Sequence, residues 1–108
     1  MRRGDLVVVV LSGNLGKPRP ALVIQSDLYA ETAGVMVVPF TSHIDAEIAF
    51  RIIIEPSASN GLRERSQLMV DKVTTLPRDK VGKIIGILDN AAIQQTSAQL
   101  SLLLGLVS

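Results

Sequence analysis

Residues 16–27 read GKPRPALVIQSD, and this stretch is the starting point for interpreting the chain. The prolines on either side of Arg19 restrict the local backbone to extended conformations. Residues 20–26 then form a short run that is apolar at successive positions instead of alternating. A strand of this kind is typical of a sheet that is covered on both faces. We therefore expect one face of the sheet to line the interior of a barrel and the other face to contact a helix or a second subunit.

Five further runs rich in Val and Ile have the same character. They are residues 6–11, 35–41, 50–55, 67–73 and 81–88. Turn-forming residues separate several of them, at Ser12-Gly13-Asn14, Asn60-Gly61 and Pro77-Arg78-Asp79. Short strands at this spacing predict a mainly β fold, either a small barrel or a sandwich.

The end of the chain has a different period. Asp89 is in a position to cap a helix, and Gly105 suits a left-handed residue at the helix end. Between and just beyond them, apolar or small residues recur at helical spacing, namely Ile93, Thr96, Leu100, Leu103, Leu104 and Val107. Leu102 and Leu106 lie off this stripe, so we expect them to be exposed or to form a dimer contact. Because there is no linker or internal repeat, residues 1–108 are predicted to be one domain.

Composition excludes several kinds of chemistry. The 108 residues contain no cysteine and one histidine, so thiolate nucleophiles and His-rich zinc sites are not expected. The ten acidic residues are scattered, which does not favour a magnesium site. We predict no metal ion and no other cofactor. No apolar stretch approaches the roughly 20 residues of a membrane-spanning helix, so the expected location is the cytoplasm with no membrane contact.

Four blocks of sequence resemble the MazF/PemK toxins. They are residues 3–7 (RGDLV), residues 16–27, residues 35–42 (VMVVPFTS), and the segments of residues 61–86 that include GLR, QLMVDKV and VGKIIG. The second block is similar to the family pattern G-x-x-RP-x-L-V-I-Q-x-D, and the third is similar to V-P-x-T. The blocks occur in the family's order and cover nearly the whole chain.

The resemblance implies an SH3-like barrel of the CcdB/PemK type with a C-terminal α-helix, a homodimer, and a cognate antitoxin as partner. It also implies metal-independent cleavage of single-stranded RNA by the adjacent ribose 2′-hydroxyl, leaving a cyclic phosphate and a 5′-hydroxyl. Arg19 and Thr41 match the family's active-site pair. A guanidinium binds phosphate through two parallel N–H bonds, so we expect Arg19 to stabilise the transition state, with the Thr41 hydroxyl reaching the same phosphate.

Further residues are expected to bind RNA. Ser42 supplies a second hydroxyl, Gln25 belongs to the second block, and Lys17 and Arg63 belong to two basic groups of the sequence. Phosphate contacts from such cations would make RNA binding depend on salt.

The proton acceptor is left open by the sequence. His43 and Asp71 are candidate acid–base groups. Met69 stands where the PemK branch has a functional arginine, which weakens the transfer of that branch's arrangement to Asp71. The loop before Arg19 is short and lacks the acidic residue of many members, which is expected to alter the preferred RNA sequence. Water, His43 or a residue of the second subunit remain the alternatives.

A rival interpretation comes from the same fold. CcdB toxins have similar V-Q-S-D and V-I-P segments and poison DNA gyrase by binding. Their gyrase contact uses a Trp-Gly-Ile C-terminus, whereas this chain ends LGLVS and has no Trp. The RP arginine favours the ribonuclease. An inactive structural module is a further alternative.

Overall fold

The computed structural model describes residues 1–11 and 16–108, and the predicted turn at 12–14 lies outside these residues. The strands are β1 (Asp5–Val9), β2 (Arg19–Val23), β3 (Gly34–Thr41), β4 (Ile52–Ile54), β5 (Ser66–Leu68), β6 (Thr74–Pro77) and β7 (Val81–Ile87). The helix α1 spans Asn90–Leu103, and short 3-10 helices are η2 (Asp27–Tyr29), η3 (Val70–Lys72) and η4 (Arg78–Lys80). The predicted mainly β fold with one C-terminal α-helix is confirmed.

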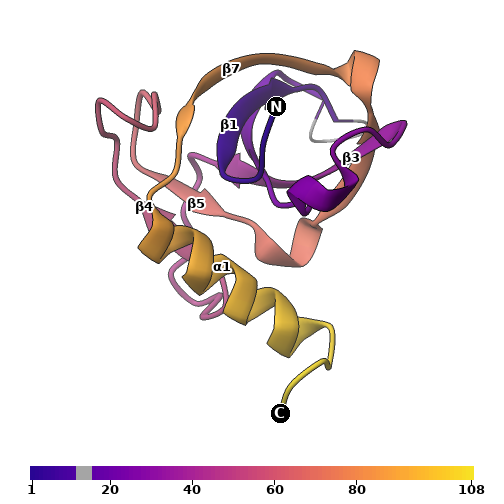
Figure 1. The fold of residues 1–108 in the computed structure, drawn as a ribbon. Coiled ribbons are helices and arrows are strands. Elements are labelled where there is room, and N and C mark those ends of the chain that lie inside the picture. The colour runs from indigo at the N-terminus through magenta and orange to yellow at the C-terminus, as the bar shows by residue number, and fades with distance from the viewer. Residues whose placement is uncertain (12–15) are drawn as a thin grey trace.

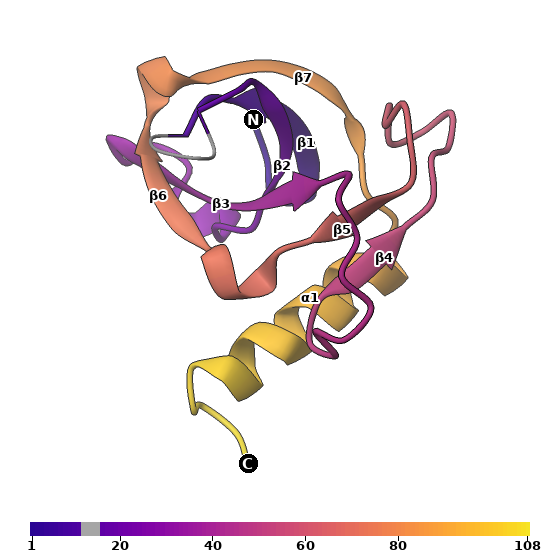
Figure 2. The same ribbon diagram turned by 180° about the vertical axis from the view of Figure 1, so that it is seen from behind.

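The strands form one strongly curved antiparallel sheet in the order β4-β5-β3-β2-β1-β7, with β6 also paired to β3. Figures 1 and 2 show that the sheet bends into a small barrel and that α1 runs along one side of it. The long strand β3 is the centre of the arrangement because it pairs with β2 along one edge and with both β5 and β6 along the other.

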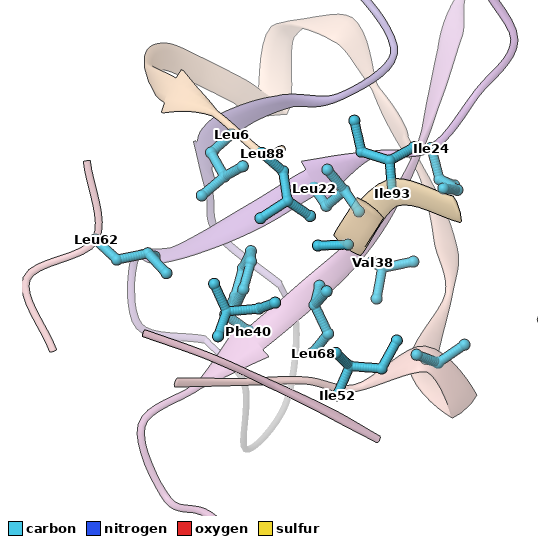
Figure 3. Close-up of a cluster of buried hydrophobic side chains, with 13 residues drawn as sticks. Leu6, Leu22, Ile24, Val38, Phe40, Ile52, Leu62, Leu68, Leu88 and Ile93 are labelled. Carbon is cyan, nitrogen blue, oxygen red and sulfur yellow. The ribbon is translucent and has the colours of Figure 1, made fainter. Parts of the chain in front are cut away.

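Both faces of the central strands are covered, as their apolar sequences predicted. In β1, Leu6 contributes to a core cluster that includes Ala92 and Ile93 of α1 (Figure 3). The next residue, Val7, belongs to a second cluster with Val37 and other small apolar residues. Successive side chains of a strand point to opposite faces, so the unbroken apolar runs serve two cores. On the first face, the covering element is the helix of the same chain.

The prediction of one strand over residues 67–73 is wrong. The chain instead forms β5, turns through η3, and resumes pairing with β3 as β6. The interruption falls opposite Pro39, whose carbonyl accepts a bond of 2.9 Å from Met69 N. Proline has no N–H with which to continue the ladder. The partner strand therefore leaves β3 at this point and returns one turn later, where Thr74 pairs with Val37.

The helix begins as predicted, because the Asp89 carboxylate accepts a hydrogen bond of 2.8 Å from Ala92 N. Gly105 has φ +72° and follows the last turn, in agreement with the predicted left-handed cap. Ile93 and Thr96 are buried, but the predicted apolar stripe does not stay packed over its whole length. Residues of its C-terminal part are exposed, namely Leu103, Leu104 and Val107. Figures 1 and 2 show the reason, since this end of the chain extends beyond the sheet.

Candidate functional site: a cationic cleft at the ends of β2 and β3

Arg19 and Thr41 lie at adjoining ends of two paired strands. Ala21 of β2 pairs with Pro39 of β3, and Arg19 and Thr41 each lie two residues beyond this pair, at the adjoining ends of the two strands. On its other edge, Arg19 pairs with Val9 of β1. The Arg19 side chain also donates from Nη1 to the carbonyl oxygen of Phe40 at 3.2 Å. The two residues predicted to be catalytic are therefore held side by side by the sheet itself.

The Arg19 guanidinium retains unused hydrogen-bonding capacity. Its Nε is buried and has no hydrogen-bond partner within the described part of the chain. Only Nη1 makes a bond to other described residues. Buried donors in native proteins are nearly always paired, so an orphaned one is often a mark of a functional site. Here it belongs to a cation that is anchored at one nitrogen and keeps other N–H groups available.

The Thr41 hydroxyl has a defined orientation. Its oxygen accepts a hydrogen bond of 3.1 Å from the backbone N–H of His43. A hydroxyl has one donor and two acceptor positions, so this contact occupies an acceptor and leaves the proton free to donate. His43 itself is exposed and is not among the residues that line the cleft described next.

Arg19 and Thr41 open into a cleft with a volume of about 580 Å³. Five residues predicted from the sequence to act on RNA line it, namely Lys17, Arg19, Thr41, Ser42 and Arg63. The other lining residues are Val8, Pro18, Pro20, Phe40, Gly61, Leu62, Glu64, Ser66, Lys83 and Ile85. The sequence prediction therefore placed most of the polar groups of this cleft, although they come from distant parts of the chain.

Two charged residues of the cleft were not predicted, Lys83 and Glu64. Lys83 and Ile85 lie two residues apart on β7, so their side chains face the same side of the strand. Lys83 is the fourth cation of the cleft, besides Lys17, Arg19 and Arg63. Glu64 is the one acidic residue among the described residues that line it. Lys83 falls within a recognised sequence block, but the face that it occupies follows from register shifts between β1 and β7. No sequence pattern gives these shifts.

One wall of the cleft is an ordered loop that connects β4 to β5. Its organiser is Asn60, which is 5% exposed. Asn60 Oδ1 accepts from Ser57 N at 3.0 Å and from Leu62 N at 2.9 Å, and its Nδ2 donates to Glu55 O at 2.9 Å. The loop also contacts β7, since Ile87 N donates to Ser59 O at 2.9 Å. Leu62 reaches from this loop into the core (Figure 3).

Gln25, which the sequence predicts to bind RNA, is not among the residues that line the cleft. Its Oε1 accepts from Met36 N at 3.1 Å, and its Nε2 donates to Tyr29 O and Thr32 Oγ1. These bonds use its amide to hold the turn between β2 and β3. In this structure the Gln25 amide is thus occupied by contacts within the turn.

Asp71 also lies away from the cleft. Its carboxylate forms a bidentate ion pair with Arg51, with Nε and Nη2 at 2.9 and 3.1 Å from the two oxygens. The hydrogen bond from Arg51 holds the pKa of the Asp71 carboxyl below its ordinary value. A carboxylate stabilised in this way is a weak proton acceptor, so the position of Asp71 does not favour the predicted acid–base role.

No group of three or more His, Cys, Asp or Glu side chains is placed to hold a metal ion in residues 1–11 and 16–108. No helix within these ranges is long and apolar enough to cross a membrane.

The fold and the cleft define a small β-barrel protein with a cationic groove at its strand ends. Residues 2–104 match the family described as "PemK-like, MazF-like toxin of type II toxin-antitoxin system". The chain is 45% identical over 108 residues to the "Probable endoribonuclease MazF" of Mycolicibacterium smegmatis, with 98% of each chain covered. The chain therefore belongs to the PemK-like, MazF-like toxin family, as its sequence predicted.

Solved structures agree on the fold. The Mycobacterium tuberculosis toxin MazF-mt6 matches with a TM-score of 0.81 at 22% identity, covering 96% of this chain and 99% of that one. An endoribonuclease in complex with its cognate antitoxin, from a mycobacterial species, matches with a TM-score of 0.82 at 22% identity, covering 100% and 98%.

Proposed function

We propose that this chain is the toxin of a type II toxin–antitoxin system and acts as an endoribonuclease that cleaves single-stranded RNA at selected sequences. The observation that carries the proposal is the juxtaposition of Arg19 and Thr41 in one cleft that is rich in cations. Family membership and the 45% identity to a probable endoribonuclease support it.

The reaction uses the substrate's own nucleophile. The ribose 2′-hydroxyl attacks the adjacent phosphorus, the bond to the 5′-oxygen breaks, and the products carry a 2′,3′-cyclic phosphate and a 5′-hydroxyl. Negative charge builds up on the non-bridging phosphoryl oxygens in the transition state. Arg19 binds these oxygens through its unoccupied N–H groups, and the Thr41 hydroxyl donates to the same phosphate.

No metal ion is needed in this scheme. Divalent ions usually serve such reactions by stabilising phosphoryl charge or by generating a hydroxide nucleophile. Here the nucleophile is part of the RNA, and the charge is met by Arg19 and its neighbouring cations. Cleavage is therefore expected to persist when divalent ions are chelated.

The rest of the cleft binds the RNA strand. Lys17, Arg63 and Lys83 line the cleft, and we expect them to contact the phosphates that flank the cleaved bond, with Ser42 as an additional hydroxyl. Phe40 is 1% exposed, so its ring is not available to stack on a base. Base selection is expected to depend on hydrogen bonds and on the guanidinium planes of the wall instead of aromatic stacking.

Two protein partners complete the proposal. The first is a second copy of the chain, and the exposed apolar residues at the end of α1 support such a contact, with Leu102, Leu104 and Leu106 between 51% and 72% exposed. Solvent-facing leucines in this density are typical of an interaction surface. The second is a cognate antitoxin, whose acidic segment would compete with RNA for the cationic cleft.

The test is incubation of the purified protein with a mixed-sequence single-stranded RNA in EDTA, followed by mapping of the cut sites and their end groups. We expect discrete cuts with 5′-hydroxyl ends. Arg19→Ala is expected to abolish them. Arg65→Ala is the matched control, because Arg65 lies on the same loop as Arg63 but pairs with Glu55 outside the cleft. It should cleave as the wild type does.

The outcome that contradicts the proposal is intact RNA from a folded wild-type protein. In that case the gyrase-poison alternative is tested directly, by asking whether the protein inhibits DNA supercoiling and whether Arg19→Ala leaves that inhibition unchanged. Sedimentation velocity separately tests the homodimer. A protein that sediments as a monomer at micromolar concentration would exclude it.

A further inference from the structure

The reaction proposed above needs a proton acceptor for the ribose 2′-hydroxyl. Most polar groups that line the cleft are unsuited to that role. Arginine stays protonated, a charged lysine has no free lone pair, and the Thr41 and Ser42 hydroxyls are very weak bases. Asp71 is committed to Arg51 and lies elsewhere. We propose that Glu64 of the cleft wall is the general base, an assignment that rests on the endoribonuclease function.

Glu64 is the one carboxylate among the described residues that line the cleft. Its side chain makes no hydrogen bond or ion pair with other residues in ranges 1–11 and 16–108. Glu55, on the same loop, differs because its carboxylate accepts a bond of 2.8 Å from Arg65. The Glu64 oxygens are therefore free to accept a proton, whereas those of Glu55 are occupied.

The loop gives Glu64 a defined position although its side chain is exposed. Leu62, two residues before it, is 7% exposed and belongs to the core, and Ser66, two residues after it, is 5% exposed in β5. Ser66 Oγ donates to the backbone carbonyl of Glu64 at 2.9 Å. Figures 1 and 2 show the loop standing beside β7 in both views. The backbone that carries the base is therefore held in place before the substrate binds.

The step balances as follows. The Glu64 carboxylate takes the proton of the 2′-hydroxyl while the 2′-oxygen forms its bond to phosphorus. The bond between phosphorus and the 5′-oxygen breaks, and the departing oxygen takes a proton from water at the open cleft. Glu64 then returns its proton to solvent. The negative charge stays on the non-bridging phosphoryl oxygens, which Arg19 and Thr41 bind throughout. The base and the charge-binding groups come from different parts of one cleft.

The test compares single-turnover cleavage by the wild type, Glu64→Gln and Glu64→Asp at the cut sites mapped for the wild type. Removal of a general base typically lowers the rate roughly 100- to 10,000-fold, and we expect Glu64→Gln to fall in this range with RNA affinity changed less than about threefold. The wild-type rate should decline toward acid pH, and this decline should vanish in Glu64→Gln. Glu64→Asp keeps a carboxylate and should retain both partial activity and the decline.

Glu55→Gln is the matched control, because it removes a carboxylate from the same loop outside the cleft. It should leave the rate and its pH dependence unchanged. The assignment is overturned if Glu64→Gln cleaves within about threefold of the wild type with the same pH dependence, or if it changes affinity alone. If the wild type cleaves RNA and Arg19→Ala does not, the proposed nuclease function would still hold without Glu64 as the base. Absence of cleavage by the wild type would overturn both.

Discussion

Replacing Asn60 by Ala tests whether the cleft wall is built by one buried amide. The substitution removes three side-chain hydrogen bonds, with Ser57 N, Leu62 N and Glu55 O. A protein hydrogen bond contributes about 0.5–1.5 kcal/mol net, and a buried donor left without a partner costs about 1–3 kcal/mol. Since the bond to Leu62 is buried, we expect Asn60→Ala to lower the free energy of unfolding by about 2–4 kcal/mol.

The assay is urea and thermal unfolding followed by circular dichroism. For a domain near this size, 1 kcal/mol shifts Tm by about 4–8 °C, so a fall of roughly 10–25 °C is expected. Ser57→Ala removes only the bond from Asn60 N to Ser57 Oγ and should have a smaller effect. Asn90→Ala changes an exposed asparagine at the start of α1 and should leave stability within about 0.5 kcal/mol.

The same variant should also weaken RNA binding well below its Tm, because Arg63 and Glu64 follow Asn60 on the loop that it organises. Hydrogen exchange of the Ser57 and Leu62 amides provides a direct readout, since both lose their acceptor. A loss of stability under about 1 kcal/mol, together with unchanged protection of these amides, would refute the view that Asn60 holds the wall.

Four other substitutions test the remaining parts of the site and fold. Thr41→Val should slow single-turnover RNA cleavage roughly 100- to 1,000-fold by removing a transition-state donor. Thr41→Ser should retain most of the rate. Equal rates for the two variants would exclude a role of the hydroxyl in cleavage. Lys83→Met should lower the slope of log affinity against log salt by about 0.7 in RNA-binding titrations, while Lys80→Met outside the cleft should not. Asp71→Asn should lower the free energy of unfolding by up to about 1 kcal/mol at neutral pH, because the ion pair with Arg51 is partly exposed to solvent. The pKa of Asp71 is lower in the folded state than in the unfolded state. This difference in stability should therefore be present above the unfolded pKa of about 3.9 and disappear as pH falls through the folded pKa. Denaturant titrations that show a constant difference across that pH range would contradict this expectation. Arg19→Met removes one hydrogen bond and one buried orphan donor, so the free energy of unfolding should change by less than about 1 kcal/mol or rise, and a large loss on denaturation would show that Arg19 is structural.

The strand predictions succeeded where hydrophobic composition alone decides the outcome. The apolar runs around Leu6, Leu22 and Val38 must be buried on two faces, and they are. The prediction over residues 67–73 failed because the cause of the break in this segment lies in the partner strand β3, at Pro39. Pro39 lacks the N–H that would continue the ladder, and periodicity within residues 67–73 carries no information about it.

The site predictions divide in a similar way. Arg19 and Thr41 were found by motif, and the register of β2 against β3 explains why two residues so far apart in sequence meet. Lys83 was not found because the shifts between β1 and β7 decide which residues of β7 face the cleft. Gln25 was predicted to bind RNA because it belongs to a sequence block that resembles a functional motif, and the structure places it outside the cleft. Within that block, however, its amide is used to hold a turn.

The architecture separates chemistry from folding by placing site residues within two positions of buried ones. Thr41 follows Phe40, which is 1% exposed, and Glu64 lies between the buried Leu62 and Ser66. A buried neighbour fixes the backbone, and the adjacent side chain is left free for the substrate. Arg19 departs from this pattern, because its own Nε is buried without a partner among residues 1–11 and 16–108. An unpaired buried donor is unfavourable for folding, so its presence is easiest to explain by the phosphate that it is proposed to bind.

The separation of chemistry from folding has a direct consequence for experiments on this chain. Loss of RNA cleavage in a Glu64 variant that remains folded reports on chemistry, whereas loss of cleavage in an Asn60 variant reports on the wall that holds Glu64 in place.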